Sequence, residues 1–161
     1  IFFEENIKLF FELYPNGYII SVVRDPLTWL RSAKFVGKKS FNINENELLK
    51  VWKKNLDVTL ELKKKFNNRV ILIKFDDLIL NTQITMQKLS KIINIIYDKS
   101  LILPSFNGNE LVSNSSIQNS KGKINQDVLK NHKLDDIKKS LDKNYLNECQ
   151  KLYHDSLNIC L

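Results

Sequence analysis

The sequence predicts an α/β fold in which helices flank a parallel sheet. Two short runs of apolar and β-branched residues, 18–23 and 70–75, have the pattern of strands that are buried on both faces. Segments with helical periodicity separate these runs, and buried strands that alternate with helices form parallel sheets. Because two strands are too few for a stable sheet of this kind, we expect the sheet to be incomplete at the N-terminus, before Ile1.

Local signals justify the helices in turn. Pro15-Asn16-Gly17 should end the first helix, and Asp25 followed by Pro26 should cap and open the second. Asn44 and Glu47 have the spacing of a capping box at the start of a third helix. The expected helices are, in chain order, 3–14, Pro26 to about Phe35, 45–66, one capped by Asn81 whose apolar stripe reaches Ile96, and about 135–158.

The organisation of the chain indicates one domain over residues 1–161. Its length suits a single core, and neither a repeat nor a linker divides it. Residues 98–123 form a long segment with turn residues throughout, and loops of that length commonly carry function. We therefore expect part of a functional site in this segment.

The chain is basic, with a formal net charge of +7, which favours anionic partners in general. Its lysines are spread along predicted helices and alternate with acidic residues, so a solvated surface explains them better than a nucleic-acid patch. We expect no nucleic-acid partner. No signal peptide is visible and the apolar runs are too short to span a bilayer, so we expect a cytoplasmic protein without a transmembrane segment.

The candidate site lies where the first strand ends. In open α/β sheets, ligands bind beyond the carboxyl ends of the strands and near helix N-termini. Arg24 stands at that point, and its guanidinium can present a planar fork to a phosphate. Ser32 lies about two turns into the next helix, with Thr28 one turn earlier on the same face. Arg24, Thr28 and Ser32 together predict a clamp for a phosphate monoester.

These residues also carry a resemblance to a known family. Residues 22–26, Val-Val-Arg-Asp-Pro, followed by Ser32 eight residues after the arginine, resemble the 3′-phosphate-binding motif of the sulfotransferases. Residues 70–78 resemble the later strand of that family, which ends in an acidic pair and a leucine, and Trp52 stands upstream, where the family often has a tryptophan. Residues 114–116, Asn-Ser-Ser, followed by Lys-Gly-Lys at 121–123, resemble its late basic loop.

The resemblance implies a fold, a cofactor and a set of binding residues. The implied fold is a three-layer, P-loop-type parallel sheet flanked by helices. The implied cofactor is 3′-phosphoadenosine 5′-phosphosulfate (PAPS), which becomes 3′,5′-adenosine bisphosphate (PAP) when its sulfuryl group moves to an acceptor hydroxyl or amine. The implied cofactor-binding residues are Arg24, Ser32, Lys121, Gly122 and Lys123.

Two parts of the family pattern have no counterpart in this sequence. The phosphate loop, a strand followed by a Pro-Lys-Ser-Gly-like turn, supplies a lysine that holds the 5′-phosphosulfate, and the general base also comes from early in the chain. We expect both to lie upstream of Ile1, so no catalytic residue is assigned and no metal is expected. The 161 residues then hold half of the cofactor site, and one interpretation leaves them inactive by themselves.

Two other function classes remain open. Asp76 follows an apolar strand in the manner of the magnesium-binding acid of nucleotide kinases and related phosphate-loop enzymes, although a structural capping role is favoured for it. The basic composition also suits a module that binds nucleic acid or a partner protein without catalysis. The acceptor stays open between carbohydrate, lipid, small molecule and protein.

Overall fold

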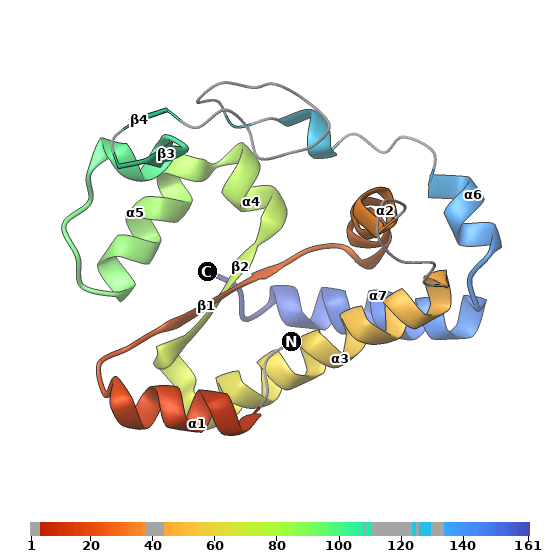
Figure 1. Ribbon diagram of the computed structural model, residues 1–161, viewed down its shortest axis with the longest axis horizontal. Coiled ribbons are helices and arrows are strands. Elements are labelled where there is room, and N and C mark those ends of the chain that lie inside the picture. The colour runs from red at the N-terminus through yellow and green to blue at the C-terminus, as the bar shows by residue number, and fades with distance from the viewer. Residues whose placement is uncertain (1–3, 38–43, 108, 111–123, 125, 130–133) are drawn as a thin grey trace.

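The computed structural model describes residues 4–37, 44–107, 109–110, 124, 126–129 and 134–161 (Figure 1). Its regular elements are, in chain order, α1 (Glu4–Leu13), β1 (Ile19–Val23), α2 (Pro26–Gly37), α3 (Glu45–Phe66), a 3₁₀ turn (Asn67–Arg69), β2 (Val70–Lys74), α4 (Phe75–Leu80), α5 (Thr82–Ile92), a 3₁₀ turn (Lys99–Ile102), β3 (Ser105–Phe106), β4 (Asn109–Glu110), a 3₁₀ turn (Gln126–Leu129), α6 (Leu134–Lys139) and α7 (Lys143–Leu157). Among these, no helix is both long and apolar enough to cross a membrane.

The predicted parallel sheet is confirmed. β1 and β2 pair in parallel, with a register that runs from Ile19 opposite Val70 to Val23 opposite Lys74. The end of the chain lies along the other edge of β2, where the amide of Leu161 donates a hydrogen bond of 2.8 Å to a backbone oxygen of that strand. β3 and β4 form a separate short antiparallel pair. The connection between β1 and β2 runs through α2 and α3, as the sequence pattern predicts.

Helices cover both faces of β2. Val70 and Leu72 belong to the larger core, which is built with α1, α2, α3, α6 and α7. Ile71 and Ile73 point to the opposite face and pack with Leu89 of α5. Because successive side chains of a strand point to opposite faces, the four consecutive apolar residues of β2 supply both cores at once. β2 therefore lies between two layers of helices.

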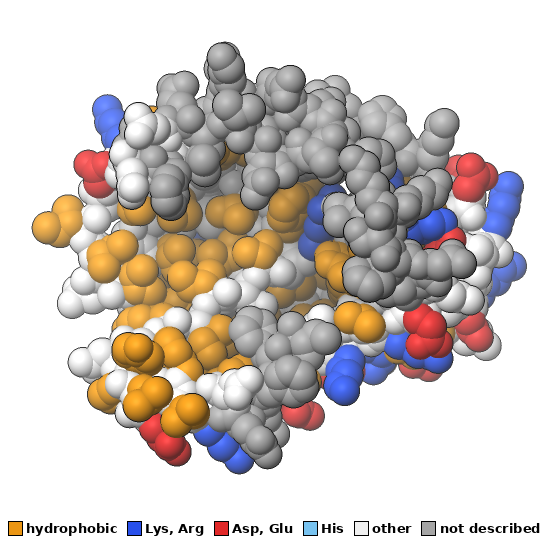
Figure 2. Space-filling model, viewed as in Figure 1, with side chains coloured by type: hydrophobic (Ala, Val, Ile, Leu, Met, Phe, Trp, Pro, Cys, Tyr) orange, Lys and Arg blue, Asp and Glu red, His pale blue; other side chains and the backbone are white. Residues whose placement is uncertain are grey.

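The prediction that β1 is buried on both faces is wrong. Its side chains at Ile20 and Val22 are 43% and 46% exposed. Paired residues of parallel strands point to the same face, so these two side chains share the face of Ile71 and Ile73. Leu89 of α5 packs on that face at Ile71 and Ile73, whereas Ile20 and Val22 of β1 stay exposed. Figure 2 shows a group of hydrophobic side chains on a hollowed part of the surface, in the region where Figure 1 draws β1 and β2.

The helices after β2 also differ from the expected ones. The segment directly after β2 forms the short helix α4, and the acidic pair Asp76 and Asp77 lies in its first turn. α5 ends at Ile92, which leaves Ile96 outside the helix and 93% exposed. The last helix is divided into α6 and α7, and Asp142 caps the second piece by accepting a hydrogen bond of 3.0 Å from the amide of Tyr145.

The N-terminal helix is fastened to the amino ends of the strands by Arg69. Its guanidinium lies 4.0 Å from the centre of the Phe11 ring and donates hydrogen bonds to the carbonyl oxygens of Tyr14 and Gly17, at 2.8 and 3.3 Å. Gly17 belongs to the predicted turn after α1, and a side chain there would come within 2.8 Å of Phe10. The predicted end of the first helix is thus confirmed.

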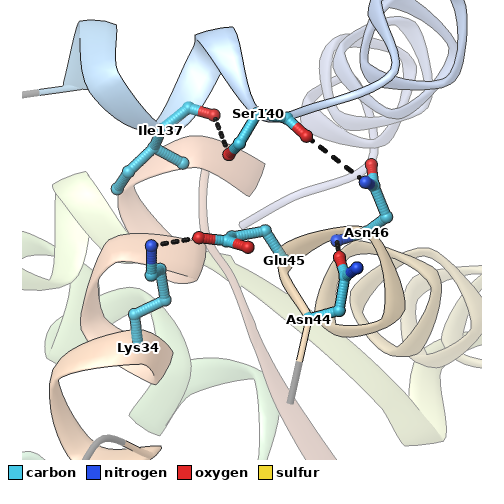
Figure 3. Close-up of polar contacts among 6 residues, drawn as sticks. All are labelled: Lys34, Asn44, Glu45, Asn46, Ile137 and Ser140. Carbon is cyan, nitrogen blue, oxygen red and sulfur yellow. Dashed lines mark hydrogen bonds and ion pairs between the residues drawn. The ribbon is translucent and has the colours of Figure 1, made fainter. Parts of the chain in front are cut away.

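A polar cluster joins the end of α2 to the start of α3 and to α6 (Figure 3). Asn44 caps α3 as predicted, but it accepts its hydrogen bond of 2.8 Å from the amide of Asn46, and the carboxylate of Glu47 pairs with Lys50. The side chain of Asn46 donates to the carbonyl oxygen of Ser140 at 3.3 Å. Lys34 of α2 forms an ion pair with Glu45, the first residue of α3. These contacts bridge the ends of α2 and α3 and hold the turn after α6.

We expect Glu45→Gln to lower the free energy of unfolding by less than about 1 kcal/mol at neutral pH, the range of a partly exposed ion pair. The hydrogen bond from Lys34 lowers the pKa of Glu45 in the folded protein. The ion pair therefore stabilises above the ordinary carboxyl pKa, and its contribution is lost as the pH falls through the lowered value. Urea titrations at neutral and acidic pH should show the two proteins converging in acid, and a constant difference would contradict this assignment.

Candidate functional site

The site begins at the first turn of α2. Asp25 accepts a hydrogen bond of 2.9 Å from the backbone amide of Thr28, and Pro26 is the first residue of the helix. The hydroxyl of Thr28 donates in turn to the carbonyl oxygen of Asp25 at 3.1 Å. These contacts confirm the predicted N-cap and fix the position of the Thr28 side chain at the carboxyl end of β1.

The guanidinium of Arg24 is held between α2 and the end of β2. Its Nε donates a hydrogen bond of 3.2 Å to Oγ1 of Thr28. Its central carbon lies 4.3 Å from the centre of the Phe75 ring, which is within the range of a cation–π contact. β1 and β2 end opposite each other, at Val23 and Lys74, so the residues that follow them, Arg24 and Phe75, stand side by side. The register of the sheet thus places this arginine on this ring.

The charges around Arg24 are mixed. Burial, and then the positive charge of Arg31, lower the pKa of the Arg24 guanidinium, while the carboxylates of Asp76 and Asp25 act in the opposite direction. An arginine keeps its proton at neutral pH in either case. Two guanidinium groups and two carboxylates therefore lie around one half-buried region. A bound anion would be attracted by the two guanidinium groups.

The indole of Trp52 fixes the backbone of the same arginine. Its Nε1 donates a hydrogen bond of 3.1 Å to the carbonyl oxygen of Arg24, and the side chain is buried. A buried indole N–H that found no acceptor would be costly, so this bond ties α3 to the end of β1. Side chain and backbone of Arg24 are thus both fixed, by three different elements.

Ser32 lies half-buried on α2, one turn after Thr28. Residues four apart share a helix face, and Arg24 reaches that face through its bond to Thr28. The structure therefore brings Arg24 and Thr28 into direct contact, and it places Ser32 next along the same face.

The comparison with known families adds a decisive observation. A sequence model described as the sulfotransferase family matches residues 2–99, which is more than half of the 161 residues. This chain belongs to the sulfotransferase family. The matched region contains both strands of the parallel sheet and the whole segment from Arg24 to Ser32. Membership supports a transferase activity that moves a sulfuryl group, and it confirms the family resemblance of the sequence. No curated protein and no solved structure matches the chain.

A cavity of about 200 Å³ lies next to the site in this sulfotransferase, and residues of β1, α2 and α3 line it. Trp29 of α2 and Trp52 of α3 form part of its wall. Polar groups interrupt this apolar surface at Ser21, Asn55 and Thr59. Arg24 also lines the cavity, which therefore adjoins the candidate site.

The outcome is different for the other residues that the sequence suggested for the site. Lys121, Gly122 and Lys123 lie outside the described residues and outside the matched region of the sulfotransferase, so their role stays a prediction. Asp76 lies in the first turn of α4, with its carboxylate 4.0 Å from the ammonium of Lys74. Among the described side chains, no three His, Cys, Asp or Glu residues gather into a potential metal site.

Two residues near Arg24 were missed by the sequence reasoning. Arg31 directly precedes Ser32 and lies about two turns after Arg24, a spacing that could have identified it. Phe75 was assigned to the strand end and given no role. The signal that could have found it is the pairing of two parallel strands of similar length, which brings their last residues together.

Proposed function

We propose that this sulfotransferase binds PAPS and transfers its sulfuryl group to a hydroxyl or amine of an acceptor. The observation that supports the proposal is the geometry of Arg24 at the carboxyl end of β1. Its guanidinium is bonded to Thr28 at 3.2 Å and stacked 4.3 Å from the Phe75 ring, beside the N-terminus of α2. A fixed guanidinium next to a helix N-terminus is suited to a phosphate dianion.

The residues of the chain would divide the binding of this cofactor between them. Arg24 and Ser32 would hold the 3′-phosphate, and Lys121, Gly122 and Lys123 would contact the phosphoadenosine end. The bound cofactor would supply the activated sulfuryl group. Because Arg24 and Ser32 act on the phosphate remote from the reacting sulfur, their contribution is positioning and discrimination between nucleotides, not bond cleavage. We also propose that the domain has a P-loop-type, three-layer fold, and we assign no general base.

The direct test is calorimetric titration of the protein with PAP, in the presence of EDTA. Adenosine 5′-phosphate, which lacks the 3′-phosphate, is the matched control ligand. We expect PAP to bind without a metal and at least about tenfold more tightly, because a charge-assisted contact to the additional phosphate is worth well over 1 kcal/mol.

Other outcomes would favour the rival functions. Nucleotide binding that requires magnesium would support a kinase-like enzyme with Asp76 as a metal ligand. Binding of RNA or DNA with a steep salt dependence, and no competition from PAP, would support a nucleic-acid-binding module. Equal affinity for PAP and adenosine 5′-phosphate would contradict the proposed role of the 3′-phosphate.

A further inference from the structure

The side chain of Arg24 is long and flexible, yet its guanidinium is oriented by contacts that come from two separate elements. The first is the hydrogen bond of 3.2 Å from Nε to Oγ1 of Thr28. A threonine hydroxyl has one proton, and that of Thr28 is donated to the carbonyl oxygen of Asp25. Toward Arg24 this oxygen can therefore act only as an acceptor, which defines the direction of the bond.

The second contact is the aromatic ring of Phe75. The guanidinium carbon lies over the ring at 4.3 Å from its centre, which is within the range of a cation–π contact. Phe75 follows β2 directly and begins α4, so its position is determined by the sheet register and not by a mobile loop. This hydrogen bond and this cation–π contact together restrict the position of the guanidinium.

We propose that Phe75 is a positioning residue, which acts on the bound 3′-phosphate by holding Arg24 ready to receive it. The inference rests on the proposed function for the identity of the anion, but the stacking itself does not. An arginine that is ordered before the ligand arrives loses less conformational freedom on binding, so removing the ring should weaken the binding of the phosphate. The benzene ring of a tyrosine would serve equally well.

The test compares Phe75→Leu and Phe75→Tyr by calorimetry with PAP and with adenosine 5′-phosphate. Phe75→Leu should weaken PAP binding about fivefold to tenfold, the range of a partly desolvated cation–π contact, and change the affinity for adenosine 5′-phosphate less than about twofold. Phe75→Tyr should retain the affinity of the wild type for both. In an Arg24→Ala background, Phe75→Leu should cause no further loss, because the two residues act as one unit.

A matched control is Phe66→Leu, which makes the same change at the distant end of α3. Phe66 packs on Phe11, with ring centres 4.4 Å apart, so its replacement should lower the unfolding temperature without altering the preference for PAP. Equal losses for both nucleotides with Phe75→Leu would show that the ring contacts the nucleoside, and would overturn the inference. An additional loss in the Arg24→Ala background would do the same.

A second measurement needs no nucleotide and separates this inference from the proposed function. The Arg24 Nε–H signal can be identified by NMR as the one lost in Arg24→Lys. We expect it to be shifted by the ring in the wild type and in Phe75→Tyr, and to return to the ordinary arginine range in Phe75→Leu. An unshifted wild-type signal would overturn the positioning role. If the wild type binds neither nucleotide, the proposed function fails, and this signal still decides whether Phe75 orients Arg24.

Discussion

Arg24→Ala should weaken the binding of PAP by about 2–4 kcal/mol, roughly 30- to 900-fold, in a calorimetric titration with EDTA present. The substitution removes a charged group that can donate two parallel hydrogen bonds to one phosphate. It also removes the group that now contacts Thr28 and Phe75. Arg24→Lys should lie between the wild type and the alanine variant, because an ammonium keeps the charge but not the fork.

Arg69→Ala is a matched control for this experiment. Arg69 also lies on an aromatic ring, 4.0 Å from the centre of Phe11, but at the amino ends of the strands, the opposite end from Arg24. Its loss should lower stability and leave PAP affinity unchanged under conditions where the variant is folded. Adenosine 5′-phosphate should bind the Arg24→Ala variant nearly as well as the wild type. Unchanged PAP affinity in Arg24→Ala would refute the assignment of this residue to the 3′-phosphate.

Much of this arrangement could be predicted, because apolar periodicity and capping residues are local signals. The boundaries of α3 follow from Asn44 at one end and Asn67 at the other, where a positive φ of 46° suits an asparagine. The four consecutive apolar residues of β2 predict a strand that is covered on both faces, and all four are buried. Arg24 could be identified because Asp-Pro after a short apolar run is a local signal for a strand that ends and a helix that begins.

The parts that were missed depend on contacts between distant segments. The composition of β1 resembles that of β2, but whether another element covers Val22 depends on the packing of distant segments, and no pattern within the strand indicates it. The position of Phe75 beside Arg24 depends on the register of two strands that lie about fifty residues apart in the sequence. The break before α7 is different, because Asp142 is a local cap that could have been recognised and was hidden by a continuous apolar stripe.

The orientation of α2 also depends on a residue that plays no part in the site. Leu30 is completely buried, with 0% of its surface exposed, and belongs to the larger core. It lies two residues from both Thr28 and Ser32, which puts its side chain on the opposite side of the helix from these hydroxyls. The packing of Leu30 therefore presents the polar face of α2 to Arg24.

Leu30→Ala should lower the free energy of unfolding by about 2–5 kcal/mol, because it removes buried methyl groups and leaves a cavity that the surrounding helices cannot fully close. Urea titration should show a lower midpoint with an unchanged slope. Leu9→Ala, the same change at a side chain that is 52% exposed, should cost less than about 1 kcal/mol. Leu30→Met keeps the volume and should cost less than about 1.5 kcal/mol, which preserves a folded variant for comparison if the alanine protein unfolds. Equal losses for Leu30→Ala and Leu9→Ala would contradict the placement of Leu30 in the core, and with it the reason why α2 turns its threonine and serine toward the arginine.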